Sequence, residues 1–169
     1  YQVNLSQRIE THIDIPPYEL YKKLRSINPA PFSSYLAFDD VAIISSSPER
    51  FLKVNDRHVQ TRPIKGTRPR GGDIKTDEMM KQALLASQKD NAELTMIIDL
   101  ERNDLGRVCD YGSVKVTERK VLEAYPTVYH LVSTIEGDLY ERYDFIDLLK
   151  ATFPGGSITG APKIRAMQI

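Results

Sequence analysis

The stretch SVKVTERKVLEAYPTVYHLVSTIEGDL, residues 113–139, predicts two long strands, Ser113–Ala124 and Thr127–Leu139. Shorter strand candidates come before it in pairs, and turn residues such as Asp39-Asp40 and Asn55-Asp56 join the two members of each pair. Connections of this hairpin kind favour an antiparallel sheet. The shorter candidates are Phe32–Phe38, Val41–Ser45, Phe51–Val54 and His58–Thr61.

Helical patterns separate these groups of strands. The first residues, Tyr1 to about Ile13, alternate as in a strand, and apolar residues then recur at helical spacing. Because strands come in runs and do not alternate singly with helices, the sequence predicts an α+β fold, a layered antiparallel β-sheet with flanking helices. The helix candidates run from Pro16-Pro17 to Asn28-Pro29, from Asp77, from about Asn91, and over Phe145–Ala151.

The composition is that of a folded globular domain. Of 169 residues, 41% are hydrophobic and 27% charged, and 23 basic residues balance 23 acidic ones. This balance argues against a general surface for nucleic acid or anionic membranes, and no apolar run approaches the roughly 20 residues of a spanning helix. The single cysteine, Cys109, has no disulfide partner, and we expect it to be a small buried hydrophobe.

The two ends indicate a piece of a longer polypeptide. The chain opens on Tyr1 in a strand pattern, with neither an initiator methionine nor a signal segment. Near the other end Pro162 opens a helix that has no C-terminal cap before the chain stops. We therefore expect residues 1–169 to be a fragment of one domain.

The segment RPIKGTRPR, residues 62–70, carries the strongest chemical signal. Lys65 lies between Pro63, which stiffens the chain, and Gly66, which lets a ligand approach the backbone, so the amine is expected at a fixed point. Four basic residues in nine positions favour the neutral, nucleophilic form of that amine. The alternative for the segment taken alone is an exposed basic loop.

Together with motifs elsewhere, this segment resembles the chorismate-utilising enzymes, a family that includes anthranilate, isochorismate and salicylate synthases and component I of aminodeoxychorismate synthase. The resemblance covers essentially the whole chain. The lysine of Pro-Ile-Lys-Gly-Thr is similar to the aminodeoxychorismate synthases, since the anthranilate and isochorismate enzymes typically carry alanine there. The motifs are Ser47–Phe51, Pro63–Thr67, Asp99–Arg107, His130–Thr134 and Phe153–Lys163.

The resemblance implies a covalent reaction at Lys65. The amine would add to C2 of chorismate while the C4 hydroxyl leaves, and ammonia would then enter at C4 and expel the lysine. The product would be 4-amino-4-deoxychorismate for folate synthesis, with ammonia supplied by a glutamine amidotransferase subunit in the cytoplasm. The resemblance also implies that residues 1–169 are a chorismate-binding catalytic fragment of a larger two-lobed sandwich, inactive alone.

Two glutamates are candidates for acid and metal chemistry. Glu49 follows a proline that predicts the first turn of a short helix, where its carboxylate would pair with Arg50. The resemblance implies instead that Glu49 is the general acid that protonates the departing hydroxyl. Glu93, by itself a helix-start carboxylate or a partner of Lys89, is implied to be a ligand of Mg²⁺ that holds the C1 carboxylate of chorismate, with the other metal glutamates beyond Ile169.

The remaining candidates would surround the substrate. His130, on its own an ordinary strand histidine, is implied to orient the substrate ring, and the glycine-rich loop, otherwise a simple turn, offers amide groups to a carboxylate. Gln2 replaces a lysine that activates water in the isochorismate and salicylate enzymes, so water is not expected as the nucleophile. The implied substrate-binding residues are Gln2, Gly66, Thr67, His130, Gly156, Ser157, Thr159 and Gly160.

The helical run Asp99–Arg107 carries three acids and two arginines, and we expect a structural network of ion pairs there without a metal role. Two other functions stay open for the whole chain. One is an anthranilate synthase, in which Lys65 would not be catalytic. The other is a non-catalytic fragment that only binds chorismate or docks onto a partner.

Overall fold

The second long strand predicted from the sequence lies at the centre of the main sheet. This strand, β8 (Val128–Asp138), pairs antiparallel with β7 (Lys115–Ala124) along one side. Along its other side it pairs antiparallel first with β5 (His58–Arg62) and then with β6 (Ile64–Pro69). β4 (Arg50–Asn55) lies next to β5 and completes five strands. The antiparallel sheet and the α+β class are thereby confirmed.

The computed structural model describes residues 1–169, which divide into two units. The larger unit comprises Tyr1–Asn4 and Phe51–Ile169 and contains the five-stranded sheet. The smaller unit, Leu5–Arg50, contains one helix and one hairpin. No helix in the chain is long and apolar enough to cross a membrane.

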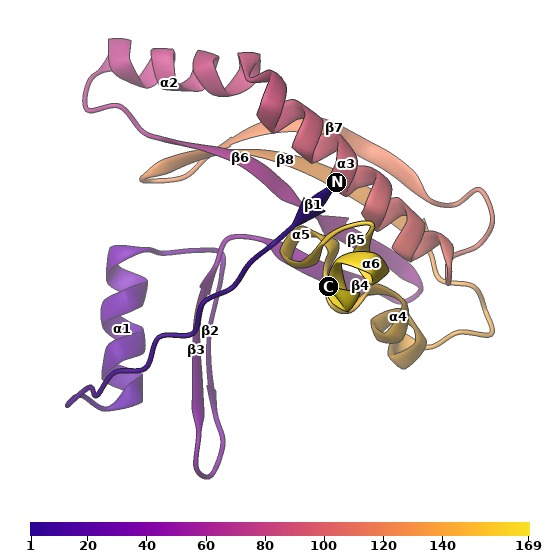
Figure 1. Ribbon diagram of the computed structural model, residues 1–169, viewed down its shortest axis with the longest axis horizontal. Helices are drawn as coiled ribbons and strands as arrows, with labels where there is room; N and C mark the ends of the chain where they lie inside the picture. The colour runs from indigo at the N-terminus through magenta and orange to yellow at the C-terminus, as the bar shows by residue number, and fades with distance from the viewer. The chain divides into compact units, whose positions relative to one another are not determined.

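Two consecutive helices, α2 (Ile74–Ala86) and α3 (Gln88–Gly106), lie along one face of the sheet (Figure 1). Both begin about three residues before the position predicted from apolar spacing. Asp73 accepts hydrogen bonds from the first free N–H groups of α2, and Ser87 accepts one from the backbone of α3. These caps extend each helix ahead of its first apolar residue.

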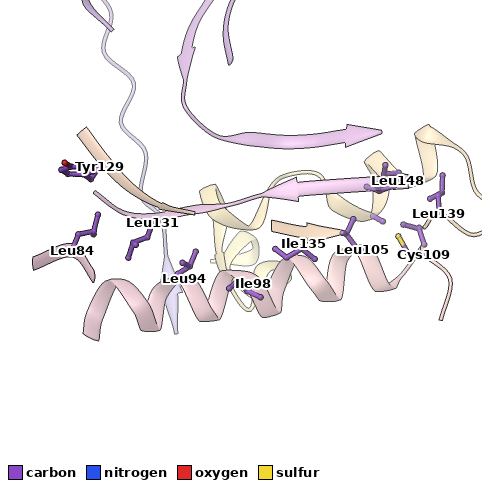
Figure 2. Close-up of a cluster of buried hydrophobic side chains, with 13 residues drawn as sticks. Leu84, Leu94, Ile98, Leu105, Cys109, Tyr129, Leu131, Ile135, Leu139 and Leu148 are labelled. Atoms are coloured by element: carbon purple, nitrogen blue, oxygen red, sulfur yellow. The ribbon is translucent and has the colours of Figure 1, made fainter. Parts of the chain in front are cut away.

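The core lies between α3 and the sheet. Leu94 and Ile98 of α3 point toward Leu131 and Ile135 of β8 (Figure 2). Leu131 and Ile135 are fully buried, and by strand alternation Val132 and Thr134 between them point to the opposite face of the sheet. Cys109 lies in the same cluster, where burial raises the pKa of its thiol to about 11, and its prediction as a buried hydrophobe is confirmed.

The smaller unit also follows the sequence prediction. Helix α1 (Pro17–Ile27) opens at the double proline, and β2 (Phe32–Ala37) pairs antiparallel with β3 (Ala42–Ser47). The ring of Tyr35 packs edge-on against that of Tyr18, with 5.3 Å between the ring centroids. This contact joins α1 to the hairpin.

Two local predictions are wrong. The strand expected over Tyr1 to Ile13 is limited to β1 (Gln2–Val3), because only these residues find a partner strand, β9 (Gly160–Ala161). The short helix expected at Glu49 does not form. Glu49 lies in a bend between two strands, because β4 begins at the very next residue and leaves no room for a turn of helix.

The C-terminal residues form three short helices, of which the first two pack against α3. They are α4 (Phe145–Thr152), α5 (Gly156–Thr159) and α6 (Lys163–Gln168). Asp144 closes a capping box at the start of α4, which fixes where that helix begins. The predicted glycine-rich turn is therefore partly helical, since α5 lies within it.

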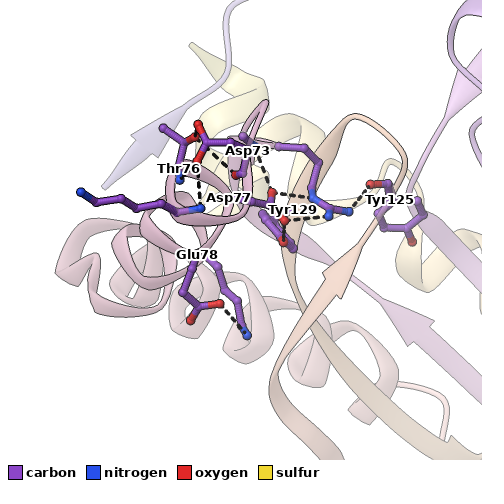
Figure 3. Close-up of polar contacts among 10 residues, drawn as sticks. Asp73, Thr76, Asp77, Glu78, Tyr125 and Tyr129 are labelled. Carbon is purple, nitrogen blue, oxygen red and sulfur yellow. Dashed lines mark hydrogen bonds and ion pairs between the residues drawn. The ribbon is translucent and has the colours of Figure 1, made fainter.

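Arg70, the residue after β6, forms an ion pair with Asp77 of α2, and Tyr129 of β8 joins this pair. Arg70 binds Asp77 through two hydrogen bonds of 2.7 Å, and the Tyr129 hydroxyl donates to the same carboxylate at 2.7 Å (Figure 3). The Arg70 guanidinium also lies 4.6 Å from the centroid of the Tyr129 ring. The Arg70 and Tyr129 bonds hold the pKa of Asp77 well below its usual range.

Candidate active site

Lys65 lies on strand β6 and not in an exposed loop, and its basic neighbours are neutralised. Each arginine of residues 62–70 is paired with a carboxylate of its own, so the segment does not form the positive patch that the sequence suggested. The pairs are Arg62–Glu123 (2.6 Å), Arg68–Asp90 (2.9 Å) and Arg70–Asp77 (2.7 Å). Lys65 is the cation of this segment that forms no ion pair.

The partner of Lys65 is a neutral backbone group in the glycine-rich loop. Its Nζ donates a hydrogen bond to the carbonyl oxygen of Ser157 at 3.0 Å. The same oxygen accepts a second bond, from Nδ2 of Asn4, at 2.9 Å. Lys65 of β6 and Asn4 of the N-terminal segment thus bind the same carbonyl group of the loop.

Two glycines let this loop pack tightly. A Cβ added at Gly156 would lie 2.3 Å from Cδ2 of Leu100 on α3. A Cβ at Gly160 would lie 2.3 Å from the backbone oxygen of Gln2, and φ at Gly160 is +139°. The loop is therefore held between α3 and β1, with the Ser157 side chain buried in between.

Gly66 separates Lys65 from a second pair of predicted site residues. Its φ is +88°, and an added Cβ would lie 2.9 Å from Cβ of Asp90. On its other side, Oγ1 of Thr67 lies 2.9 Å from Nδ1 of His130, at hydrogen-bond distance, and the two residues are partners in the sheet ladder. Lys65 and His130 are thereby fixed on adjacent strands of one sheet.

His130 lies on the face of the sheet opposite the hydrophobic core. Burial lowers its pKa, and the nearby Glu123 carboxylate only partly offsets that effect. The Tyr125 ring meets the imidazole edge-on with 5.3 Å between centroids, and the Tyr125 hydroxyl donates to Glu123 at 2.7 Å. The hydrogen bonds from Tyr125 and Arg62 lower the pKa of Glu123 by more than its burial raises it. The net pKa is therefore below its ordinary value, and this carboxylate stays ionised.

The helical run Asp99–Arg107 takes part in a buried polar network, but its ion pair is with Lys163 outside the run and not with its own arginines. Asp104 pairs with Lys163 at 2.6 Å, and both side chains are more than nine-tenths buried. Lys163 also donates to the carbonyl oxygen of Thr152 at 3.0 Å, and Thr61 donates to Glu101 at 2.8 Å. Burial raises the pKa of Asp104, and the ammonium of Lys163 opposes that rise.

Glu93 lies on α3 and is partly exposed. Its closest ionic partner is Lys89 at 3.8 Å, one turn earlier, which matches the simpler interpretation of this residue. An accessible carboxylate fits Mg²⁺ as one hard oxygen ligand, since this ion keeps several waters. The chain contains no group of three acidic, histidine or cysteine side chains that could hold a metal by itself.

Glu49 belongs to the smaller unit, whereas Lys65, His130, Gln2 and the glycine-rich loop belong to the larger one. Within its own unit, its backbone N–H donates to Oγ of Ser47 at 3.3 Å, which shapes the bend before β4. Its assignment as a general acid stays a prediction.

Sequence reasoning missed Asn4 and Tyr125. Asn4 is two residues after Gln2, so an extended segment places both side chains on one side, and Nε2 of Gln2 donates to Oδ1 of Asn4 at 3.0 Å. The spacing of two between Gln2 and Asn4 was the sequence signal from which Asn4 could have been predicted as a site residue. Nothing in the sequence pattern indicated that Tyr125, between two strands, would turn back onto His130.

Comparison with known proteins identifies the class. Over residues 1–169 the chain matches the family described as chorismate binding enzyme. It is 53% identical over its whole length to aminodeoxychorismate synthase component 1 of Salmonella typhimurium, covering 37% of that protein. It is 46% identical over 99% of its length to anthranilate synthase component 1 of Aquifex aeolicus, covering 34% of that protein. The chain therefore belongs to the chorismate-binding enzyme family.

A solved structure shares the fold. Anthranilate synthase component I from Streptococcus pneumoniae superposes with a TM-score of 0.81 at 37% identity, over 92% of this chain and 34% of that one. The chain spans little more than a third of the length of the curated relatives that it matches, with 37% and 36% for two aminodeoxychorismate synthase components.

Proposed function

We propose that the protein containing residues 1–169 aminates chorismate at C4, with Lys65 as a covalent nucleophile. The observation that carries the proposal is the state of Lys65. It forms no ion pair, while each arginine around it does, and the Ser157 carbonyl holds its amine at 3.0 Å. A lysine that had only a structural role on a sheet would be expected to pair with a carboxylate or to extend into solvent.

The proposed reaction has two displacements. The Lys65 amine forms a bond to C2, both ring double bonds shift by one position, and the C4–O bond breaks. Glu49 supplies the proton with which the hydroxyl leaves as water, and its carboxylate then takes the extra proton from the lysine nitrogen. Ammonia forms a bond to C4, both double bonds shift back, and the C2–N bond to Lys65 breaks. The leaving amine takes its proton from Glu49, which recovers one from the new ammonium group at C4. The product is 4-amino-4-deoxychorismate, a precursor for folate synthesis.

The other site residues would orient the substrate. His130 on β8, neutral because of its burial, forms a polar pair with Thr67, which lies two residues after Lys65 on β6. The amide groups of Gly156, Ser157, Thr159 and Gly160 would face a carboxylate of the substrate. Mg²⁺, when bound, would hold the C1 carboxylate, and Glu93 is the ligand that this chain offers to it.

The relatives support an aminating enzyme with a second component. Several of the curated proteins similar to this chain are named aminodeoxychorismate synthase component 1. We propose by analogy that a glutamine amidotransferase subunit delivers ammonia to this chain. A second candidate function, anthranilate synthase, is favoured by relatives of that name at 46% and 47% identity.

The experiment is to incubate the full-length parent protein with chorismate, Mg²⁺ and ammonium and to identify the product by mass and chromatography. The parent is expected to release aminodeoxychorismate and to form a lysine adduct that intact-protein mass spectrometry detects. Lys65→Ala should lose the adduct and most of the product, whereas Lys53→Ala, which removes an exposed lysine, should lose neither. Anthranilate as the product would contradict C4 amination, and no product at all would favour a docking fragment.

A further inference from the structure

The carbonyl group that holds Lys65 is itself held by Asn4. Nδ2 of Asn4 donates to the Ser157 oxygen at 2.9 Å, and Nζ of Lys65 donates to the same oxygen at 3.0 Å. A carbonyl oxygen has two lone pairs, and here each of them has one donor. With one donor fixed, the direction in which the second donor must approach is fixed as well.

The position of Asn4 is determined by the backbone. Its N–H donates to the Thr159 carbonyl at 3.0 Å, just beyond the ladder that pairs Gln2 with Ala161 and Val3 with Gly160. The backbone nitrogen of Tyr1 donates to the Ala161 carbonyl at 2.9 Å. Residues 1–4 are thus bound along the loop, and the Asn4 side chain has little freedom to leave Ser157.

A second observation is a buried acceptor on Gln2 that has no donor in the chain. Nε2 of Gln2 donates to Oδ1 of Asn4 at 3.0 Å, which turns the other atom of the Gln2 amide, Oε1, away from Asn4. Oε1 is buried and accepts no hydrogen bond from the chain. A buried acceptor without a donor is costly in a folded protein unless a ligand or water supplies the donor.

We propose that Asn4 is a positioning residue for the site. Through its two amide atoms it fixes the Ser157 carbonyl that holds the Lys65 amine, and it orients Gln2 so that Oε1 can accept an N–H or O–H group of the substrate. The inference rests on the proposed role of Lys65. In this proposal Asn4 does not contact the reacting atoms. It acts through its hydrogen bonds to Ser157 and Gln2.

The test uses the full-length parent protein and the variants Asn4→Ala and Asn4→Leu, the second of which keeps the side-chain volume. With chorismate and Mg²⁺, the rate of lysine-adduct formation in a single turnover should fall by about 10-fold or more, because a misplaced nucleophile reacts slowly. KM for chorismate should rise by a smaller factor than the rate falls, because the variants loosen the substrate contact of Gln2 but leave the other binding groups in place.

A second measurement does not depend on the reaction. Without chorismate, trace acetic anhydride labels lysines, and mass spectrometry of peptides compares Lys65 with exposed Lys53 in the same sample. In both Asn4 variants the relative labelling of Lys65 should rise by about threefold or more, because a loosened carbonyl releases the amine to solvent. Asn28→Ala removes another asparagine, which donates to Ser46 in the smaller unit, and should leave both measurements unchanged.

The outcomes separate the two proposals. If the parent forms no adduct or Lys65→Ala keeps full activity, the proposed function fails, while the labelling experiment still decides whether Asn4 positions Lys65. If the parent forms the adduct but both Asn4 variants keep its rate and the parent labelling, the role of Asn4 is overturned. An equal change in Asn28→Ala would overturn it as well.

Discussion

Among the four cations of residues 62–70, three are neutralised by carboxylates on other elements and one is not. Arg62, Arg68 and Arg70 tie this segment to β7, α3 and α2 with planar donors that suit carboxylates. Lys65, between them in the sequence, has a neutral carbonyl partner instead. In the proposed function this difference separates the structural role of the arginines from the chemical role of Lys65.

At the residue scale, the ion pair of Asp77 predicts an acid-sensitive stability. Arg70 and Tyr129 hold the pKa of Asp77 below the value of about 3.9 expected for the unfolded chain. A depressed folded-state pKa means that this contribution to stability is fully present above that unfolded value and is lost as the pH falls below it. The free energy of unfolding should therefore decrease between about pH 5 and pH 2.

Urea denaturation at a series of pH values checks this prediction. Asp77→Asn should be less stable than the parent at neutral pH and should lose less stability on acidification. Asp40→Asn, at an exposed turn between β2 and β3, should follow the parent curve. Parallel curves for parent and Asp77→Asn would contradict the assignment.

At the element scale, the segment between α4 and α6 is joined to α3 by one buried side chain. Lys163 begins α6 and binds Thr152 at the end of α4 as well as Asp104 on α3. The glycine-rich loop lies between these two anchor points. A small pocket behind the loop is lined by Thr61, Glu101, Asp104 and Gly156, among other residues. Lys163 therefore ties both ends of the loop that holds Lys65 to each other and to Asp104 of α3.

Lys163→Met is expected to lower the free energy of unfolding by about 3–5 kcal/mol, because it leaves the Asp104 carboxylate buried without a counter-charge. The double variant Asp104→Leu/Lys163→Met should recover most of that loss, since two apolar groups replace the pair. Chemical denaturation measures both. Lys150→Met, at an exposed position on α4, is the matched control. A loss below about 0.5 kcal/mol in Lys163→Met would show that the pair contributes little.

At the scale of the whole molecule, the two units differ in how much they bury. The larger unit contains the entire buried core, including fully buried side chains such as Leu84, Leu131 and Leu148. In the smaller unit no residue is buried, and α1 has no buried side chain. Local stability follows buried apolar contact, so the units should open at different free energies.

Hydrogen exchange of the 169-residue chain tests this difference. Amides of β8, paired on both sides and buried, should exchange last, and those of α1, β2 and β3 should exchange earlier by at least about 100-fold, which corresponds to roughly 2.7 kcal/mol. Equal protection in the two units would contradict the prediction. Amides of α3 that face the core serve as the internal reference for the larger unit.

The antiparallel class, the hairpins and the helices followed from the sequence because alternation, helical spacing and proline positions act over a few residues. The motif around Lys65 likewise indicated the family. The predictions of a strand over Tyr1–Ile13 and of a helix at Glu49 were wrong for a related reason. A local pattern does not show whether a partner strand lies nearby, as the first needed, or whether enough residues remain before the next strand, as the second needed.

The sequence by itself determined the fold class and the family, and it predicted which residues carry chemistry, above all Lys65, His130 and the glycine-rich loop. Only the tertiary structure decided what each of them faces. It showed that the arginines next to Lys65 are paired and that the Ser157 carbonyl receives Lys65, with Asn4 as the second donor. The physical reason is that a hydrogen bond requires two atoms about 3 Å apart. Asn4 and Ser157 are separated by 153 positions along the chain and meet only after β1 pairs with β9.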